Sequence, residues 1–252
     1  MSLSIVLMGL LVGFLVGLTG VGGAALLTPI LLFIGVNPSI AVGTDLFYNS
    51  ITKFFGVIQH WRQKSINFKL VKYFSIGSVP SAVLAITVLY FSNIQERESF
   101  MKHTLGYVLI AVSLSILFQL FFASKVKPNK IQLKSIEEKR GLTIGLGVVF
   151  GFLVGLTSIG AGSLFAVAMF FLYRVSAVEL VGTDIAHAFI LVTVAGLLNV
   201  GFGNVNFLLA GNLLIGSIPG VLLGSSFSAK VPAKSIRTIM AVVILISGLK
   251  MI

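Results

Sequence analysis

The sequence predicts an all-α polytopic membrane protein built from two inverted repeats, and three observations support this prediction. First, 57% of the 252 residues are hydrophobic and only 10% are charged, whereas soluble domains carry about 25% charged residues. Second, apolar runs of about 20 residues, enough for a helix to cross a bilayer, follow one another along the chain. Third, a glycine-rich run near the N-terminus returns 138 residues later.

The net charge of +11 indicates membrane topology rather than nucleic-acid binding. All Lys and Arg residues except Lys53 lie between or beyond the apolar runs, which is where basic residues set the orientation of a membrane protein. We therefore expect the lipid bilayer, and no nucleic acid, as a partner of this chain.

The duplicated run predicts a helix that is broken by glycines. The heptapeptide GFLVGLT is identical at residues 13–19 and 151–157. Glycines at every fourth position lie on one helix face, where a second helix can approach closely. After each copy glycines crowd together, in GVGG at 20–23 and SIGAG at 158–162, and a helix would break there. Two such breaks at matching positions are a sequence pointer to a transporter's binding site.

The first repeat covers residues 1–123. Its second apolar segment is short for a full crossing, so we expect a re-entrant helical hairpin around the break, with two full spans as the alternative. Asn37-Pro38 indicates the start of the next helix, because Asn is a common N-cap and Pro fits the first helical position. In order, the expected segments are 3–19, 21–35, 38–61, 70–92 and 104–123.

The polar stretch 124–140 is the expected linker, and the second repeat covers residues 141–252. After its broken segment, a capping box formed by Ser176 and Glu179 predicts the start of the next helix. In order, the expected segments are 141–173, 176–200, 207–228 and 233–250.

Three further motifs recur at an offset of 139 residues. Together with the glycine-rich run they make four matches in the same order, which predicts a duplication. The pairs are GTD at 43–45 and 182–184, NF at 67–68 and 206–207, and GSVP at 77–80 with GSIP at 216–219.

The charge of equivalent loops reverses between the halves. The loop at 61–72 is basic, whereas its counterpart at 200–206 carries no charge; 93–103 has as many acidic as basic residues, whereas 229–237 is basic only. This reversal is what an inverted repeat requires. With the linker 124–140 in the cytoplasm, both termini are expected outside the cell.

Three residues that are normally charged fall well inside apolar segments: Asp45, Lys53 and Asp184. Charge at that depth costs at least about 2.5–3.5 kcal/mol, which favours a functional role. Asn49 lies four residues from both Asp45 and Lys53, so the three share one helix face. Asp45, Asp184 and His187 are candidates for binding a coupling proton. The alternatives are that Asp45 and Lys53 neutralise each other, that the aspartates cap broken helices, and that His187 makes only a structural contact.

The two breaks predict an anion site, because helix N-termini present free N–H groups and the positive end of the helix dipole. The alternative is that the glycines serve helix packing alone. The candidate substrate-binding residues are those of the breaks and of the polar helix face: Thr19, Gly20, Val21, Gly22, Gly23, Asn49, Lys53, Thr157, Ser158, Ile159 and Gly160.

Catalytic signatures are absent from the sequence. Without cysteine there are no disulfides, thiolate metal sites or cysteine nucleophiles, and neither HExxH nor GxSxG occurs. We expect no enzymatic activity, no cofactor and no bound metal.

The two breaks, the paired GTD motifs and the paired GS(V/I)P motifs resemble the TauE/SafE sulfite-exporter family over nearly the whole chain. The resemblance implies an integral protein of the cell inner membrane that moves small anions, namely sulfite and organosulfonates where a substrate is known. It places the family's glycine motif at residues 19–23 and 157–162. The second copy departs from the first in having Ser158 and Ala161 in place of glycines.

We therefore expect a secondary transporter that exports a small anion, sulfite or an organosulfonate, by alternating access around a midplane site between the two breaks. The first alternative is a proton-coupled permease for a cation or another small solute, which uses Asp45 and Asp184. An intramembrane enzyme and a non-transporting scaffold are further alternatives. The oligomeric state stays open, with a homodimer as one arrangement.

Overall fold

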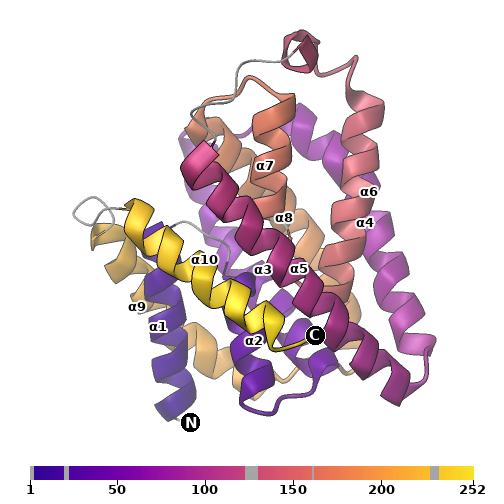
Figure 1. Cartoon of the computed structure of the whole chain (residues 1–252), viewed down its shortest axis with the longest axis vertical. Coiled ribbons are helices and arrows are strands. Elements are labelled where there is room, and N and C mark those ends of the chain that lie inside the picture. Colours follow the sequence, from indigo (N-terminus) through magenta and orange to yellow (C-terminus); the bar gives the residue numbers. More distant parts are fainter. Residues whose placement is uncertain (1–2, 20–22, 123–129, 161, 228–232) are drawn as a thin grey trace.

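A computed structural model shows that the chain folds into helices (Figure 1). The residues that the structure describes contain no strand. Those residues are 3–19, 23–122, 130–160, 162–227 and 233–252. The helices are α1 (Leu3–Thr19), α2 (Ala24–Phe33), α3 (Pro38–Arg62), α4 (Phe68–Phe91), α5 (Ile94–Phe122), the 3-10 helix η2 (Lys130–Leu133), α6 (Arg140–Thr157), α7 (Ser163–Leu172), α8 (Ala177–Gly201), α9 (Phe207–Phe227) and α10 (Ala233–Leu249).

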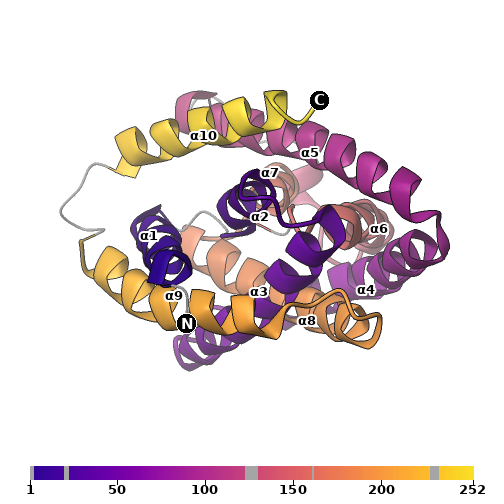
Figure 2. The same cartoon turned by 90° about the horizontal axis from the view of Figure 1, so that it is seen from below.

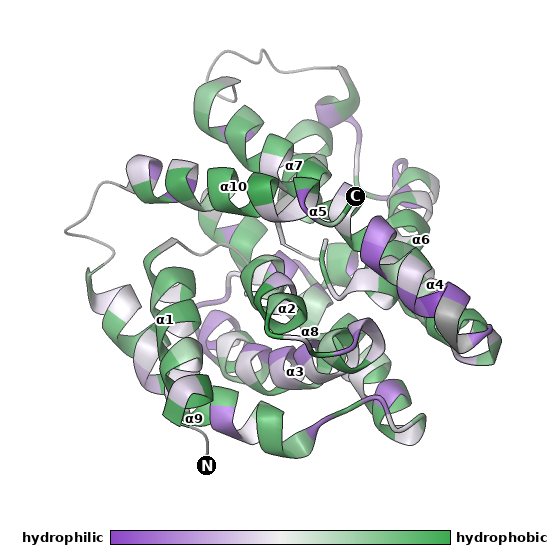
Figure 3. Cartoon of the chain, turned by 60° about the horizontal axis from the view of Figure 1, so that its bottom comes forward, coloured by the Kyte–Doolittle hydropathy of each residue, from purple (hydrophilic) through white to green (hydrophobic). Residues whose placement is uncertain are grey.

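The surface of the fold is apolar, as a bilayer requires. Five described helices, α4, α5, α6, α8 and α9, are long and apolar enough to cross a membrane. Large apolar side chains face outward, among them Leu84 at 60% and Leu222 at 66% exposure, and hydrophobic residues cover much of the outer helices (Figure 3). An apolar surface of this extent belongs in contact with lipid. The expectation of an all-α polytopic membrane protein is confirmed.

The two glycine-rich segments form short helix pairs. α1 has 17 residues, whereas α2 and α7 have 10 each. At 1.5 Å per residue a helix of ten residues covers about 15 Å, roughly half the hydrocarbon thickness of a bilayer. The length of α2 and α7 therefore favours a re-entrant hairpin over two full spans in each half.

The glycine faces of α1 and α6 pack against helices of the opposite half. A Cβ atom on Gly13 of α1 would lie 2.4 Å from the carbonyl oxygen of Ser217 in α9, and one on Gly151 of α6 would lie 2.1 Å from that of Ser78 in α4. Figure 2 shows α1 beside α9 and α4 beside α6, with α2 and α7 between these pairs. The expected close packing on the glycine face is confirmed.

The paired GTD and NF motifs also meet across the halves. The Thr44 hydroxyl accepts a hydrogen bond of 3.0 Å from the backbone N–H of Asn206, and the Thr183 hydroxyl accepts one of 3.0 Å from that of Asn67. Each asparagine then caps its own helix through its side-chain oxygen. The start of α3 is thereby bound to the start of α9, and α8 to α4.

The linker is anchored to the second half by a buried lysine. Lys139, the residue before α6, is 4% exposed. Its ammonium donates to the carbonyl oxygen of Leu172 at 2.7 Å and lies 4.3 Å from the centre of the Tyr173 ring. A cation at the C-terminal end of a helix is stabilising, so this contact holds the start of α6 against the end of α7.

One expected boundary is wrong. Residues 93–103 were expected to form a loop, but α5 already begins at Ile94. The carbonyl oxygen of Asn93 accepts a hydrogen bond of 2.8 Å from the N–H of Arg97, which closes the first turn. The Gln, Glu, Arg and Lys residues that make this segment polar are good helix formers, so polarity here marks a solvated helical turn.

Candidate functional site

Asp45 is the centre of a buried polar network in the middle of the bundle. Its side chain is fully buried. One carboxyl oxygen, Oδ2, accepts hydrogen bonds from the hydroxyls of Thr28 at 3.0 Å and Ser158 at 2.6 Å. The other, Oδ1, accepts from the amide of Asn49 at 2.8 Å. The network therefore joins α2, α3 and the residue that follows α6.

The geometry of this network suits a neutral carboxyl group. The hydroxyl oxygens of Thr28 and Ser158 are also 2.8 Å apart, so three oxygen atoms form a triangle of hydrogen-bonding distances. Two hydroxyl groups supply two protons for these three contacts. All three contacts can be hydrogen bonds only when Oδ2 of Asp45 carries a third proton and donates it to one of the two hydroxyls instead of accepting from it.

The second break is held by its own side chains. Ser158, directly after α6, has a left-handed backbone (φ 61°, ψ −7°), and its N–H donates to the carbonyl oxygen of Val154. Gly160 has φ 124°, a value that favours glycine. The Thr157 hydroxyl donates to the carbonyl oxygen of Leu153 at 2.7 Å and accepts from the N–H of Ile159 at 3.2 Å. This turn directs the Ser158 side chain toward Asp45.

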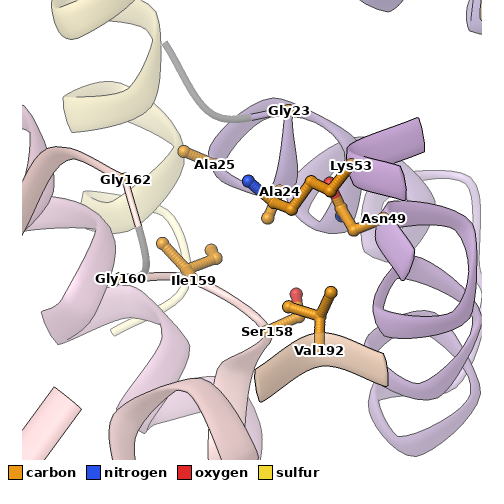
Figure 4. Close-up of a pocket in the computed structure, with 10 residues that line it drawn as sticks. All are labelled: Gly23, Ala24, Ala25, Asn49, Lys53, Ser158, Ile159, Gly160, Gly162 and Val192. Atoms are coloured by element: carbon orange, nitrogen blue, oxygen red, sulfur yellow. The ribbon is translucent and has the colours of Figure 1, made fainter. Parts of the chain in front are cut away.

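A pocket, termed the central pocket, lies between the two breaks (Figure 4). Its free volume is about 20 Å³, enough for about one water molecule. Its lining comes from the N-terminal turn of α2, from α3, from the second break and from α8. The lining residues are Gly23, Ala24, Ala25, Asn49, Lys53, Ser158, Ile159, Gly160, Gly162 and Val192.

The Lys53 side chain extends from α3 along the central pocket, which Ala24 in the first turn of α2 also lines (Figure 4). In the described ranges the one ion pair is that between Lys69 and Glu137, at 2.7 Å. Lys53 therefore pairs with neither aspartate there, although its charge acts electrostatically on Asp45 and Asp184. A direct Asp45–Lys53 ion pair, one of the sequence alternatives, is not formed.

Asp184 occupies the position of Asp45 in the second half but lacks its partners. At the 139-residue offset, Ala188 replaces Asn49 and Val167 replaces Thr28. Its Oδ1 atom is buried and has no hydrogen-bond partner among the described residues. The two aspartates of the repeated motif are therefore chemically unequal.

His187 contacts the first half rather than Asp184. Its Nε2 atom lies 2.8 Å from the hydroxyl of Ser78. The ring stacks on Phe165, with centroids 5.0 Å apart, and Nδ1 has no partner among the described residues. The His187 ring is therefore fully buried in a largely aromatic environment, and its Nδ1 atom is available for a further hydrogen bond.

The structure brings together many of the residues predicted from the sequence. Gly23, Asn49, Lys53, Ser158, Ile159 and Gly160 line one pocket. Thr157 does not line it, and the side chain of Thr19 and residues 20–22 lie outside the described residues.

The sequence interpretation missed Thr28, whose hydroxyl contacts both Asp45 and Ser158. A hydroxyl side chain within the apolar run of α2 was the available signal.

These features define a polytopic helical membrane protein with a polar site at two helix breaks. The chain belongs to the sulfite exporter TauE/SafE family, whose sequence model matches residues 5–251. It is 63% identical over 254 residues to a probable membrane transporter protein, YjnA, of Bacillus subtilis (strain 168), with all of both chains covered. It is therefore a membrane transporter.

More distant relatives carry the same description. Identity is 27% to the probable membrane transporter protein YunE of Bacillus subtilis (strain 168), covering 98% of this chain and 96% of that one. It is 31% to the probable membrane transporter protein MJ0441 of Methanocaldococcus jannaschii, covering 63% and 57%. No solved structure matches the chain.

Proposed function

We propose that this transporter is a secondary exporter of a small oxyanion, sulfite or an organosulfonate, which binds in the central pocket. One observation carries the proposal: the Lys53 ammonium shares the pocket with the N-terminal turn of α2. Both are electrically positive, because a helix N-terminus carries a partial positive charge. An anion between them offsets both charges and accepts hydrogen bonds from the ammonium and from backbone N–H groups.

The other polar residues of the pocket have a supporting role in this arrangement. Asn49 and Ser158 donate their hydrogen bonds to Asp45. Ser158, together with Thr28 on α2, therefore holds α2, α3 and the second break at a fixed spacing around the anion. Release of the Asp45 network would free two additional donors for the substrate.

Transport requires the pocket to open, since about 20 Å³ is too small for a sulfite ion. The reciprocal contacts of the two halves, with Thr44 on Asn206 and Thr183 on Asn67, support an inverted repeat. In alternating access, one such half rocks against the other around a midplane site. Helices α1 and α9 meet through glycines, as do α4 and α6, so each pair is suited to move as one unit.

The coupling proton is assigned to Asp184, with His187 as a neighbouring carrier. The three mutual contacts of Asp45, Thr28 and Ser158 are all satisfied when the Asp45 carboxyl group keeps its proton. Asp184 has an unpartnered buried oxygen and lies within the electrostatic reach of Lys53. Proton binding at Asp184 would therefore change the charge around the pocket, whereas Asp45 acts as a structural group.

The orientation follows from the basic residues. The linker and the basic turn between α3 and α4 face the cytoplasm, and both termini face out of the cell inner membrane. In Figure 1, η2 lies at the top, whereas the N-terminus and the C-terminus lie in the lower half. This arrangement agrees with the proposal.

The alternative of a cation permease is favoured by one observation, the unpartnered carboxyl oxygen of Asp184. In that case Asp184 would bind the solute, and Lys53 would serve as a counter-charge. The two functions differ in the sign of the transported species.

A reconstitution experiment separates them. The purified protein in liposomes is supplied with sulfite, methanesulfonate or monovalent and divalent cations on one side. The proposal predicts saturable movement of sulfite or methanesulfonate that is unaffected by the choice of cation. Saturable cation movement without anion transport would overturn it.

A further inference from the structure

A second pocket lies toward the opposite end of the bundle from the linker. It is enclosed by the starts of α3 and α5, the end of α4, the last turns of α6 and α8, and the turn before α9. Its free volume is about 10 Å³, at the lower limit for one water molecule. Its polar lining residues are Ser39, Tyr90, Arg97, Asn199 and Asn204.

Arg97 brings a positive charge into this pocket without an acidic partner. Its Nε atom is buried and has no hydrogen-bond partner among the described residues. The adjacent Glu96 and Glu98 form no ion pair with it there. Arg97 also lies in the first turns of α5, where a cation faces the positive end of the helix dipole. A guanidinium whose Nε atom is buried and unpaired is costly in this position unless an anion compensates it.

The neighbouring polar groups are mainly donors. The Asn204 amide makes one contact, to Oδ1 of Asn199 at 3.4 Å, so a second N–H stays available. The Ser39 hydroxyl donates to the sulfur of Met101 at 3.6 Å, a weak acceptor. The Tyr90 ring stacks on Phe202 with centroids 3.9 Å apart, which fixes its position at the pocket. A donor-rich site with one guanidinium suits a small oxyanion.

The second pocket lies about two helical turns from the central pocket along both α3 and α8. On α3, Val42 lines the second pocket and Asn49 lines the central pocket; on α8, Asn199 lines the second pocket and Val192 lines the central pocket. Seven residues of helix correspond to about 10 Å. Asp45 lies between the two levels on α3, so its hydrogen-bond network separates the pockets.

We propose that Arg97, with Asn199 and Asn204, forms a second binding site for the transported oxyanion, at the outer end of its path. The site rests on the proposed function, because it takes the same class of anion. The anion leaves the central pocket when the Asp45 network opens. The second pocket, which at about 10 Å³ is too small for the anion, must widen as well before the Arg97 guanidinium can hold it ahead of release. The guanidinium fork provides two parallel donors to two oxygen atoms of one anion.

The test measures anion exchange from each side. Exchange of radiolabelled methanesulfonate and sulfite is followed in right-side-out and inside-out membrane vesicles. Arg97→Gln is expected to raise the half-saturating concentration from the outer side about tenfold or more, the loss typical of a charged hydrogen bond. The value from the inner side stays unchanged. Lys102→Gln, which removes an exposed charge from the same helix, is the matched control and should leave both values unchanged.

Two further variants distinguish a loss of anion binding from misfolding. Asn204→Ala removes a donor from the second pocket and should also raise the half-saturating concentration measured from the outer side. Arg97→Lys keeps the charge, so its half-saturating concentration should lie between those of the wild type and Arg97→Gln. Equal half-saturating concentrations for the wild type, Arg97→Gln and Asn204→Ala on the outer side would overturn this site and leave the central pocket in place. Absence of anion exchange by the wild type would overturn both proposals.

Discussion

Ser158 donates a 2.6 Å hydrogen bond to Asp45 although the two residues are 113 positions apart in the chain. The bond joins the break of the second half to the GTD motif of the first. Asp184, the repeat equivalent of Asp45, has no such partner among the described residues. The duplicated motif therefore contains one carboxyl group whose two oxygens both have hydrogen-bond partners and one with an unpartnered oxygen. We expect the two aspartates to respond differently to substitution.

The first prediction concerns the stability of the Asp45 network. Thr28→Val removes one hydroxyl while keeping the side-chain shape, and should lower the free energy of unfolding by about 1–3 kcal/mol, because a buried carboxyl group loses a donor. Thermal unfolding in detergent measures the effect. Thr52→Val is the control, since its hydroxyl contacts only backbone carbonyls of its own helix. Equal unfolding of the two variants would show that the network adds no stability.

The second prediction concerns coupling. Asp184→Asn should abolish accumulation driven by a pH gradient while leaving anion exchange largely intact, because exchange needs no net proton movement. Asp45→Asn should keep gradient-driven accumulation, since the amide is neutral like the proposed carboxylic acid. Accumulation and exchange are compared in liposomes with and without a gradient. Loss of coupling in Asp45→Asn alone would reverse the assignment.

The third prediction concerns the glycine face of α6. Gly151→Ala places a methyl group 2.1 Å from a backbone oxygen of α4, so the helices must separate. We expect a loss of about 1–3 kcal/mol, typical of overpacking. Gly145→Ala in the same helix meets no atom within 4 Å and should be neutral or slightly stabilising, because Ala is a better helix former. Thermal unfolding distinguishes them, and similar behaviour of both would contradict close packing.

The fourth prediction concerns the inverted repeat. In this cysteine-free chain, Gln63→Cys and Lys134→Cys should react with an impermeant thiol reagent from the cytoplasmic side. Gly201→Cys should react from the outside. All three residues are exposed. Labelling of positions 63 and 201 from the same side would exclude an inverted arrangement.

The helical architecture was largely predictable from the sequence. Apolar length and glycine spacing gave the segments, because a bilayer leaves a chain few alternatives to helices. The polar face of Asp45, Asn49 and Lys53 was predictable from its spacing of four residues. These features depend on local sequence alone.

The partners across the fold were not predictable in this way. Thr28 lies next to Pro29 in an apolar run, and nothing local indicates that its hydroxyl meets Asp45. Arg97 was assigned to a loop because its neighbours are polar, whereas packing of α5 carries it into a pocket. Such contacts depend on how the two halves dock, which a single sequence does not encode in any short pattern.

Lys53 provides the most direct test of the anion site. Lys53→Met replaces a half-buried charge with an apolar chain of similar length, so the fold should persist, while Lys72→Met removes an exposed charge as a control. Binding of sulfite and methanesulfonate to the purified proteins is measured by calorimetry. Lys53→Met should weaken binding more than about tenfold, and the double variant Lys53→Met with Asp184→Asn should not recover it. Full anion binding in the double variant would show that Lys53 is only a counter-charge for Asp184 and would contradict the proposed site.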